Sequence, residues 1–189
     1  MQKYELRLSG SGGQGLILAG IMLGEAASIY DGKESVQSQS YGPEARGGAS
    51  RSEVIISDLP IDFPKVVKAD FMLSMTQESY DKYISGLKEE GILLIDSFFV
   101  TKIKPRNGPV YSMDLTRIAI EKAGKKIFAN VVSLGAIVAL TGIVSLGAME
   151  KTVLKRAPGG TEDLNLRALE EGYKAALEIK EKVPMEMGR

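Results

Sequence analysis

The chain has 189 residues, 44% of them apolar and 25% charged, a composition typical of one globular domain. Lysine and arginine balance aspartate and glutamate at 24 each, so no net charge favours nucleic acid or an anionic membrane. Cysteine and histidine are absent, which excludes disulfides, an iron–sulfur cluster held by cysteines of this chain, and a histidine base or zinc ligand from it.

Strand-like and helix-like segments alternate along the chain. Strands are predicted, in order, at 4–9, near 34–37, and at 50–57, 70–75, 91–96 and 110–113. Helices are predicted at 14–30, at 77–86 with Thr76 as a candidate N-cap, at 114–122, from Asn130 onwards and at 161–182. This alternation predicts an α/β fold over a single domain, 1–189, with a mostly parallel open sheet and helices on both faces.

Residues 127–149 form a run of 23 positions without a charge, long enough to cross a bilayer. Glycines, serines and threonine dilute this run, and small residues suit close approach of packed backbones, so a buried core helix partly shared with another subunit is favoured over a membrane span. The N-terminal residues lack the apolar core of a signal peptide, and the expected location is the cytoplasm. In the last helix, one apolar face is expected to hold Leu166, Leu169, Tyr173, Ala176 and Leu177.

A glycine-rich string follows the first predicted strand directly and opens the first helix. It reads Gly10-Ser11-Gly12-Gly13-Gln14-Gly15 and fits the G-x-G-x-x-G spacing of a Rossmann-like first βα unit. Glycines permit close backbone approach, and a helix N-terminus attracts a phosphate or carboxylate. The dinucleotide pattern is incomplete, because Gln37 and Ser38 stand where a ribose-binding acid belongs. A tight turn that only packs helix on sheet remains an alternative.

A long polar loop separates the second and third strands. Its turn signals are Tyr41-Gly42-Pro43 and Gly47-Gly48, and Glu44 and Arg46 stand between them. Arg46 is a candidate bidentate ligand for a carboxylate or phosphate. Alternatively, Glu44, Arg46, Arg51 and Glu53 pair with one another or with a neighbouring subunit. Further along, Asp96 ends a strand where open α/β sheets bind ligands, or else it caps the next turn.

Several strings resemble the gamma subunit of 2-oxoacid:ferredoxin oxidoreductases. They are the glycine string with the helix LILAGIMLGEAA, the segment VQSQSYGPEARGGASRSEVIIS, the stretch that begins ADFMLSMTQESYDKY, the strand GILLIDS, and the helix that opens at Asn130 and continues SLGAIVAL. The resemblance covers about residues 4–150 and is most specific in the loop from Tyr41 to Gly48. The sequence of this segment most resembles the 2-oxoglutarate branch of the family. The pyruvate and branched-chain 2-oxoacid (ketoisovalerate) branches are related to it.

The resemblance implies an accessory subunit of a thiamine-diphosphate-dependent enzyme that decarboxylates a 2-oxoacid, passes electrons to ferredoxin and transfers the acyl group to coenzyme A. Alpha and beta partners, with a delta subunit as a further candidate, would carry thiamine diphosphate, magnesium and the iron–sulfur clusters. In agreement, the chain has no cysteine and no G-D-G…N motif, the nearest string being Tyr30-Asp31-Gly32. It would bind no cofactor alone, would be inactive alone, and would help to form the coenzyme A site.

The residues expected at that site are those of the glycine string, Gly10 to Gly15, together with Tyr41, Glu44 and Arg46. Two other functions remain open at this point. One is a standalone nucleotide-dependent oxidoreductase that uses the glycine string, and the other is a subunit that serves assembly only. The first requires an acid after the second strand and a catalytic base, and neither is evident in a chain without histidine.

Overall fold

The computed structural model describes residues 3–40 and 48–182. The strands are β1 (Tyr4–Ser11), β2 (Glu34–Ser40), β3 (Ala49–Ser57), β4 (Ala69–Ser74), β5 (Leu87–Asp96) and β6 (Val110–Met113). The helices are α1 (Leu16–Glu25), α2 (Gln77–Tyr83), α3 (Leu115–Ala123), α4 (Ala129–Thr141), α5 (Leu146–Arg156) and α6 (Glu162–Lys182). Short helical turns are η1 (Ala26–Tyr30), η2 (Ile84–Gly86) and η3 (Lys126–Phe128).

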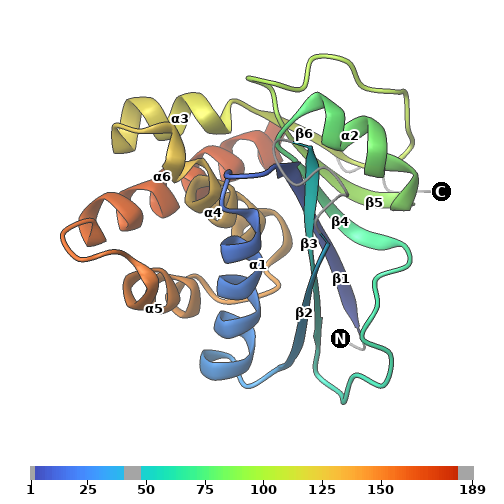
Figure 1. Cartoon of the computed structure of the whole chain (residues 1–189), viewed down its shortest axis with the longest axis horizontal. Coiled ribbons are helices and arrows are strands. Elements are labelled where there is room, and N and C mark those ends of the chain that lie inside the picture. The colour runs from blue at the N-terminus through green and yellow to red at the C-terminus, as the bar shows by residue number, and fades with distance from the viewer. Residues whose placement is uncertain (1–2, 41–47, 183–189) are drawn as a thin grey trace.

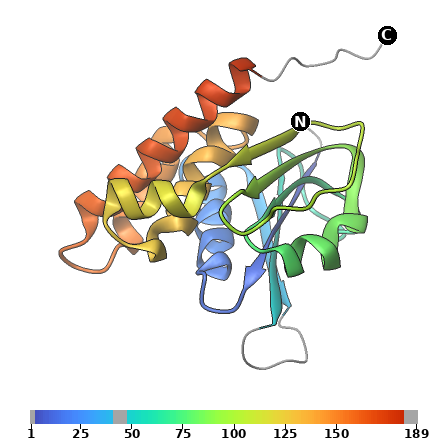
Figure 2. The same ribbon diagram turned by 90° about the horizontal axis from the view of Figure 1, so that it is seen from above.

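The strands form a single sheet in the order β2-β3-β1-β4-β5-β6. Neighbouring pairs are parallel from β1 through β4 and β5 to β6, while β3 is antiparallel to both β1 and β2. One face of the sheet is covered by α2, and the other by the remaining helices (Figures 1 and 2). The prediction of an α/β fold with a mostly parallel open sheet and helices on both faces is therefore confirmed.

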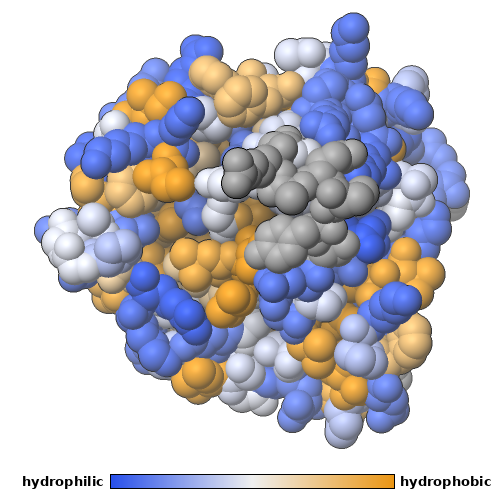
Figure 3. Space-filling model, viewed as in Figure 1, coloured by the Kyte–Doolittle hydropathy of each residue, from blue (hydrophilic) through white to orange (hydrophobic). Residues whose placement is uncertain are grey.

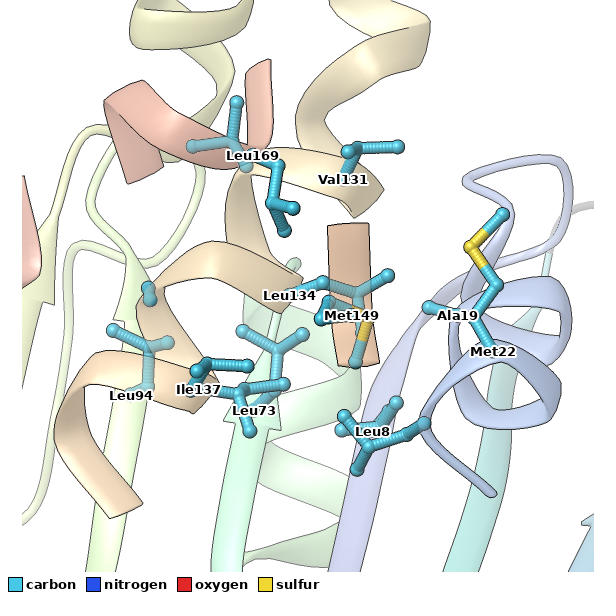
Figure 4. Packing of buried hydrophobic residues seen from close by; sticks show 14 of the residues in the cluster. Leu8, Ala19, Met22, Leu73, Leu94, Val131, Leu134, Ile137, Met149 and Leu169 are labelled. Atoms are coloured by element: carbon cyan, nitrogen blue, oxygen red, sulfur yellow. The ribbon is translucent and has the colours of Figure 1, made fainter. Parts of the chain in front are cut away.

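The main core lies between the sheet and the larger helical layer. Strand residues Leu8, Leu73 and Leu94 project toward it, and Leu134 and Ile137 of α4 meet them from the helical side (Figure 4). From Ala129 to Leu140 every residue of α4 is buried, which explains why that helix reads as apolar on all sides. A smaller core under α2 contains Tyr80, Tyr83 and Ile95, among others.

The apolar run 127–149 is not one helix. Thr141 ends α4, and Gly142 follows it in the left-handed conformation with φ 60°, which only glycine adopts readily. The chain turns, and Ser145 caps α5 by accepting a hydrogen bond from the Ala148 N–H. The predicted buried helix is present, but its end at Thr141 and the separate helix α5 were not predicted. No helix within the described ranges is long and apolar enough to cross a membrane.

Helices α4 and α6 cross at two glycines. A Cβ built on Gly135 would lie 2.0 Å from the Leu169 carbonyl oxygen, and one built on Gly172 would lie 2.0 Å from the Val132 carbonyl oxygen. The two backbones are therefore in direct contact, and any larger side chain at either position would collide with main-chain atoms. The expectation that small residues allow close backbone approach is confirmed here.

The buried face of α6 differs from the predicted one. Leu169 and Ala176 are buried as expected, but Leu177 is 40% exposed. The fully buried positions are Asn165, Ala168, Leu169, Gly172 and Ala176. The buried face is rotated relative to the predicted one because α6 comes closest to α4 at Gly172. The prediction was based on large apolar residues and did not include glycine as a contact residue.

Glu25, at the end of α1, joins this helix to the end of α5. Its carboxylate lies 2.5 Å from Lys155 Nζ and accepts a 2.7 Å hydrogen bond from Arg156 Nε, while the glutamate is only 8% exposed. Burial alone would raise the pKa of Glu25, but the hydrogen bonds from Lys155 and Arg156 outweigh it and hold the pKa below its ordinary value.

The pKa of Glu25 is lower in the folded protein than in the unfolded chain. The bonds of its carboxylate to Lys155 and Arg156 therefore contribute fully to stability above the pKa of an unfolded glutamate, and this contribution is lost as pH falls through the folded-state pKa. We expect Glu25→Gln to lower the free energy of unfolding at neutral pH by about 1–2 kcal/mol. Thermal melts of both proteins from pH 7 down to acid should converge. A difference in melting temperature that persists unchanged at acid pH would contradict this assignment.

Candidate functional site

The glycine string forms the turn between β1 and α1, as predicted. Gly13 and Gly15 have φ of 90° and 75°, in the left-handed region where glycine is favoured. Gly12 and Gly13 are exposed, and Gly15 is the N-cap residue of α1 without a side-chain hydrogen bond to that helix. By contrast, α2, α3 and α5 begin with capping side chains from Thr76, Asp114 and Ser145. The first N–H groups of α1 thus lack the side-chain acceptor that these three helices have.

Gln14 folds back over the turn. Its Oε1 accepts a 2.8 Å hydrogen bond from the Ser11 N–H, and a Cβ on Gly10 would lie 2.2 Å from the same oxygen. Gly10 is therefore required for this side chain to lie flat against β1. Gln14 was predicted to open the helix, but α1 begins at Leu16, so Gln14 belongs to the turn and closes it internally.

Asn130 packs against the other end of the turn. A Cβ on Gly15 would lie 2.5 Å from Asn130 Nδ2, so the first turn of α4 lies directly against the start of α1. The Asn130 side chain is almost fully buried, and its Nδ2 donates a long, 3.4 Å hydrogen bond to the Gly15 carbonyl. Asn130 was predicted only as the start of a helix, and its contact with the glycine turn, 115 residues away, was not predicted.

The strands on either side of the polar loop end at this same edge of the sheet. Tyr41, Glu44 and Arg46 lie outside the described residues, but the strands that flank the loop are defined. Ser40 pairs with Arg51, and Ala49 pairs with Ser11 at the end of β1. The ends of the loop and the glycine turn therefore meet at the carboxyl end of β1.

The two charged residues after the loop have partners within the sheet. Glu53 accepts a 2.8 Å hydrogen bond from Arg7 Nε, its cross-strand neighbour in β1, and both residues are buried. Arg51 Nε lies 3.6 Å from the same carboxylate oxygen, and its guanidinium stacks 5.3 Å from the centre of the Tyr83 ring. The predicted pairing of Arg51 with Glu53 is present, but Arg7, which the sequence analysis missed, is the closer partner.

Asp96 is a structural residue and not an open ligand site. Its Oδ1 accepts hydrogen bonds from the Phe98 and Thr116 N–H groups, and its Oδ2 accepts a 2.5 Å hydrogen bond from Thr116 Oγ1. Burial raises the pKa of the Asp96 carboxyl, although these hydrogen bonds oppose the rise. Of the two alternatives for Asp96, the cap of the next turn is therefore correct.

A separate pocket of about 540 Å³ lies at the opposite end of the sheet, between the start of β5 and the loop 104–107. Arg106 crosses it, but its guanidinium donates to four backbone carbonyls, those of Lys88, Glu89, Gly91 and Pro109. These contacts anchor the loop to β5 and occupy the arginine. Among the residues that the structure describes, no group of three or more acidic, histidine or cysteine ligands comes together.

The order of the strands argues against a dinucleotide site. In such sites the second strand lies directly beside the first, so that its terminal acid reaches the ribose. Here β3 separates β2 from β1, and β1 is bordered by β3 and β4. Gln37 and Ser38 thus lie one strand too far from the glycine turn, in addition to lacking the acid.

Residues 5–175 match the family described as pyruvate ferredoxin/flavodoxin oxidoreductase. The chain belongs to this family. It is 54% identical over 179 residues to the 2-oxoglutarate synthase subunit KorC of Methanocaldococcus jannaschii, covering 94% of this chain and 96% of that protein.

Solved structures give the same result. The gamma subunit of a keto/oxoacid ferredoxin oxidoreductase from Geobacter sulfurreducens is 53% identical, with a TM-score of 0.88 over 95% of this chain and 99% of that chain. The pyruvate oxidoreductase subunit PORC of Thermotoga maritima is 31% identical, with a TM-score of 0.76 over 92% and 97% of the two chains. The chain is thus a gamma-type subunit of a 2-oxoacid:ferredoxin oxidoreductase, as the resemblance implied.

Proposed function

We propose that this gamma subunit belongs to an enzyme that oxidises 2-oxoglutarate to succinyl-coenzyme A and passes the electrons to ferredoxin. The choice of 2-oxoacid is supported by the 54% identity to a 2-oxoglutarate synthase subunit, against 31% identity to a pyruvate oxidoreductase subunit. Both relatives match nearly the whole chain, so the difference is not caused by partial coverage.

The cofactors of the reaction would be held by other subunits. The chain has no cysteine to bind an iron–sulfur cluster and no motif for magnesium and thiamine diphosphate. Alpha and beta partners, with delta as a further candidate, would supply these centres and most of the substrate specificity. The gamma chain alone would therefore have no 2-oxoacid oxidation activity, and its own residues would contribute by binding and positioning a group at the edge of the assembled site.

We infer that the glycine turn, Gly10 to Gly15, receives a phosphate group of coenzyme A. The observation that carries this proposal is the exposed turn with two left-handed glycines before an α1 helix that lacks a side-chain cap. Its free N–H groups and the positive end of the helix dipole favour an anion. Tyr41, Glu44 and Arg46 belong to the same proposal, because the strands flanking their loop end beside the turn.

Replacement of Gly13 by valine tests this site in the assembled enzyme. A Cβ at Gly13 meets nothing within 4 Å, so the new side chain would project into the space that the phosphate would use. We expect the apparent affinity for coenzyme A to fall at least about tenfold, equivalent to about 1.4 kcal/mol, with little change for the 2-oxoacid. Steady-state kinetics with ferredoxin as acceptor would measure both.

Gly160→Val is the matched control, because Gly160 has a similar φ of 82° and open space but lies in the turn before α6. Gly160→Val introduces a similar backbone strain at a position outside the glycine turn. Equal effects of the two variants on the response to coenzyme A, or no effect of Gly13→Val in a stable complex, would favour the turn as a packing element only. Oxidation of 2-oxoacid by the gamma chain alone would contradict its accessory role.

A further inference from the structure

The pocket between the start of β5 and the loop 104–107 is built on an irregularity of the sheet. Ala69 and Phe71 are two positions apart in β4. Their partners in β5, Leu87 and Ile92, are five positions apart, so the intervening residues bulge away from β4. Three carbonyl groups of this bulge accept hydrogen bonds from Arg106. Arg106 thus holds the loop across the bulge, and a cavity of about 540 Å³ remains between the two segments.

Arg106 brings a positive charge to this pocket without a counter-ion. Its two terminal nitrogens donate to backbone carbonyl groups, which carry no net charge. Its Nε–H has no acceptor within residues 3–40 and 48–182. Burial lowers the pKa of the Arg106 guanidinium, as is expected of a cation that no carboxylate compensates.

Tyr80 brings a buried hydroxyl group to the same pocket. The residue is 1% exposed, and its oxygen accepts a 2.7 Å hydrogen bond from the Lys104 N–H. A phenol can also donate one hydrogen bond, but no described residue accepts from Tyr80. A buried donor without an acceptor costs free energy, so the hydroxyl favours an acceptor placed in the pocket. The Lys104 side chain lines the pocket as well and forms no ion pair within the described part of the chain.

The other charges of the lining are already compensated or hydrogen-bonded. Lys88 lies 2.6 Å from Asp70. Among the lining residues that the structure describes, Glu89 is the single acidic one, and its Oε1 accepts a 2.7 Å hydrogen bond from the neutral amide of Asn107. The two cations without a counter-ion therefore outnumber this carboxylate by one. One further negative charge would make the pocket electrically neutral.

The remaining walls of the pocket are apolar. Ile84, Leu87 and Pro105 line the cavity together with Tyr80. By contrast, the surface over the neighbouring helix α2 is mostly hydrophilic on the face shown in Figure 3. The volume of the cavity is in the range of sites for small organic molecules, which combine apolar walls with a few polar groups. The lining therefore suits an organic anion better than a bare inorganic ion.

We propose that this pocket binds an organic monocarboxylate with an apolar body. The carboxylate accepts hydrogen bonds from the Tyr80 hydroxyl, the Lys104 ammonium group and Arg106 Nε, and the apolar body lies against the apolar walls. A phosphate fits less well, because the terminal nitrogens of Arg106 are already bonded and cannot grip an oxyanion as a fork. The pocket lies at the opposite end of the sheet from the glycine turn, so this site is independent of the one proposed for coenzyme A.

Benzoate is the probe that tests the proposal on the full chain. Titration followed by ¹⁵N–¹H NMR should shift the amide signals of the bulge and of loop 104–107, with a dissociation constant on the order of 1 mM. Lys104→Gln and Tyr80→Phe should each weaken binding about tenfold, because each removes one hydrogen bond to a charged group. Lys102→Gln is the matched control, since Lys102 is exposed on the same segment but does not line the pocket.

Four results would overturn the proposal. The first is the absence of a saturable shift at benzoate concentrations about tenfold above the expected dissociation constant. The second is equal binding of benzamide, which has the same shape without the charge, or an equal loss of affinity in Lys102→Gln. The third is tighter binding of inorganic phosphate than of benzoate at the same ionic strength. The fourth is binding to the isolated chain but not, by calorimetry, to the assembled enzyme, because the pocket would then belong to a subunit interface.

Discussion

Gly135→Ala is expected to lower the free energy of unfolding by more than about 3 kcal/mol, although it adds a single methyl group to a helix. Alanine normally stabilises a helix relative to glycine by about 1 kcal/mol. At this crossing, however, the methyl carbon would lie 2.0 Å from the Leu169 carbonyl oxygen and 2.7 Å from the Tyr173 nitrogen. Both are main-chain atoms of α6, so relief requires the two helices to separate and to leave gaps in the core.

Gly147→Ala is the matched control for this prediction. Gly147 lies inside α5, is exposed, and has no atom within 4 Å of an added Cβ. Because Gly147 is the second residue of α5, where the gain in helix propensity is smaller than in a helix interior, Gly147→Ala should leave the free energy of unfolding unchanged or raise it by less than about 1 kcal/mol. Urea unfolding followed by circular dichroism would compare the two variants. If Gly135→Ala were as stable as the unmodified chain, the backbone contact between α4 and α6 would be wrong.

Removal of either partner of the buried ion pair Arg7–Glu53 is expected to lower the free energy of unfolding by about 3–5 kcal/mol. Only 4% of Arg7 and 7% of Glu53 are exposed. Glu53→Leu leaves the Arg7 guanidinium buried without its partner, and Arg7→Met leaves the Glu53 carboxylate with only the more distant Arg51. Replacement of both should cost much less than the sum of the single variants, because no unpaired charge remains at this position except that of the more exposed Arg51.

The measurement is a double-mutant cycle by urea unfolding, which isolates the coupling between the two side chains. Lys174→Met is an appropriate control, because Lys174 pairs with Glu170 at an exposed i,i+4 position of α6. That exposed pair should contribute less than about 1 kcal/mol. Additive losses in the Arg7–Glu53 cycle would show that each residue acts through other contacts.

Local patterns in the sequence were sufficient to predict most of the elements. Each of the six strands was found, because apolar runs such as GILLID are bounded by glycine, proline or acidic residues. The end of α4 was missed because Gly142 lies between Thr141 and Ile143 in a run that is apolar on both sides. Helix α5 was missed because its first residues continue that run, while its later residues are charged.

The part of the candidate site that is contiguous in sequence was predicted, whereas the contacts between distant residues were not. The glycine turn is a contiguous string, and its strand–turn–helix context follows from neighbouring residues. Arg7 and Glu53 are 46 positions apart, and only the antiparallel pairing of β1 with β3 makes them neighbours. Asn130 reaches Gly15 only through the packing of α4 on α1. Contacts of this kind depend on register and helix placement, which the periodicity of one segment does not contain.

The bond from Glu25 to Lys155 and Arg156 also has a consequence during synthesis. It spans 130 and 131 residues, so the ribosome must release about four-fifths of the chain before the carboxylate of α1 meets its cations. Until then, α1 can dock on the sheet only without this ion pair. Helix α1 therefore gains its attachment to α5 only late in synthesis, long after the strands on which it packs have been made.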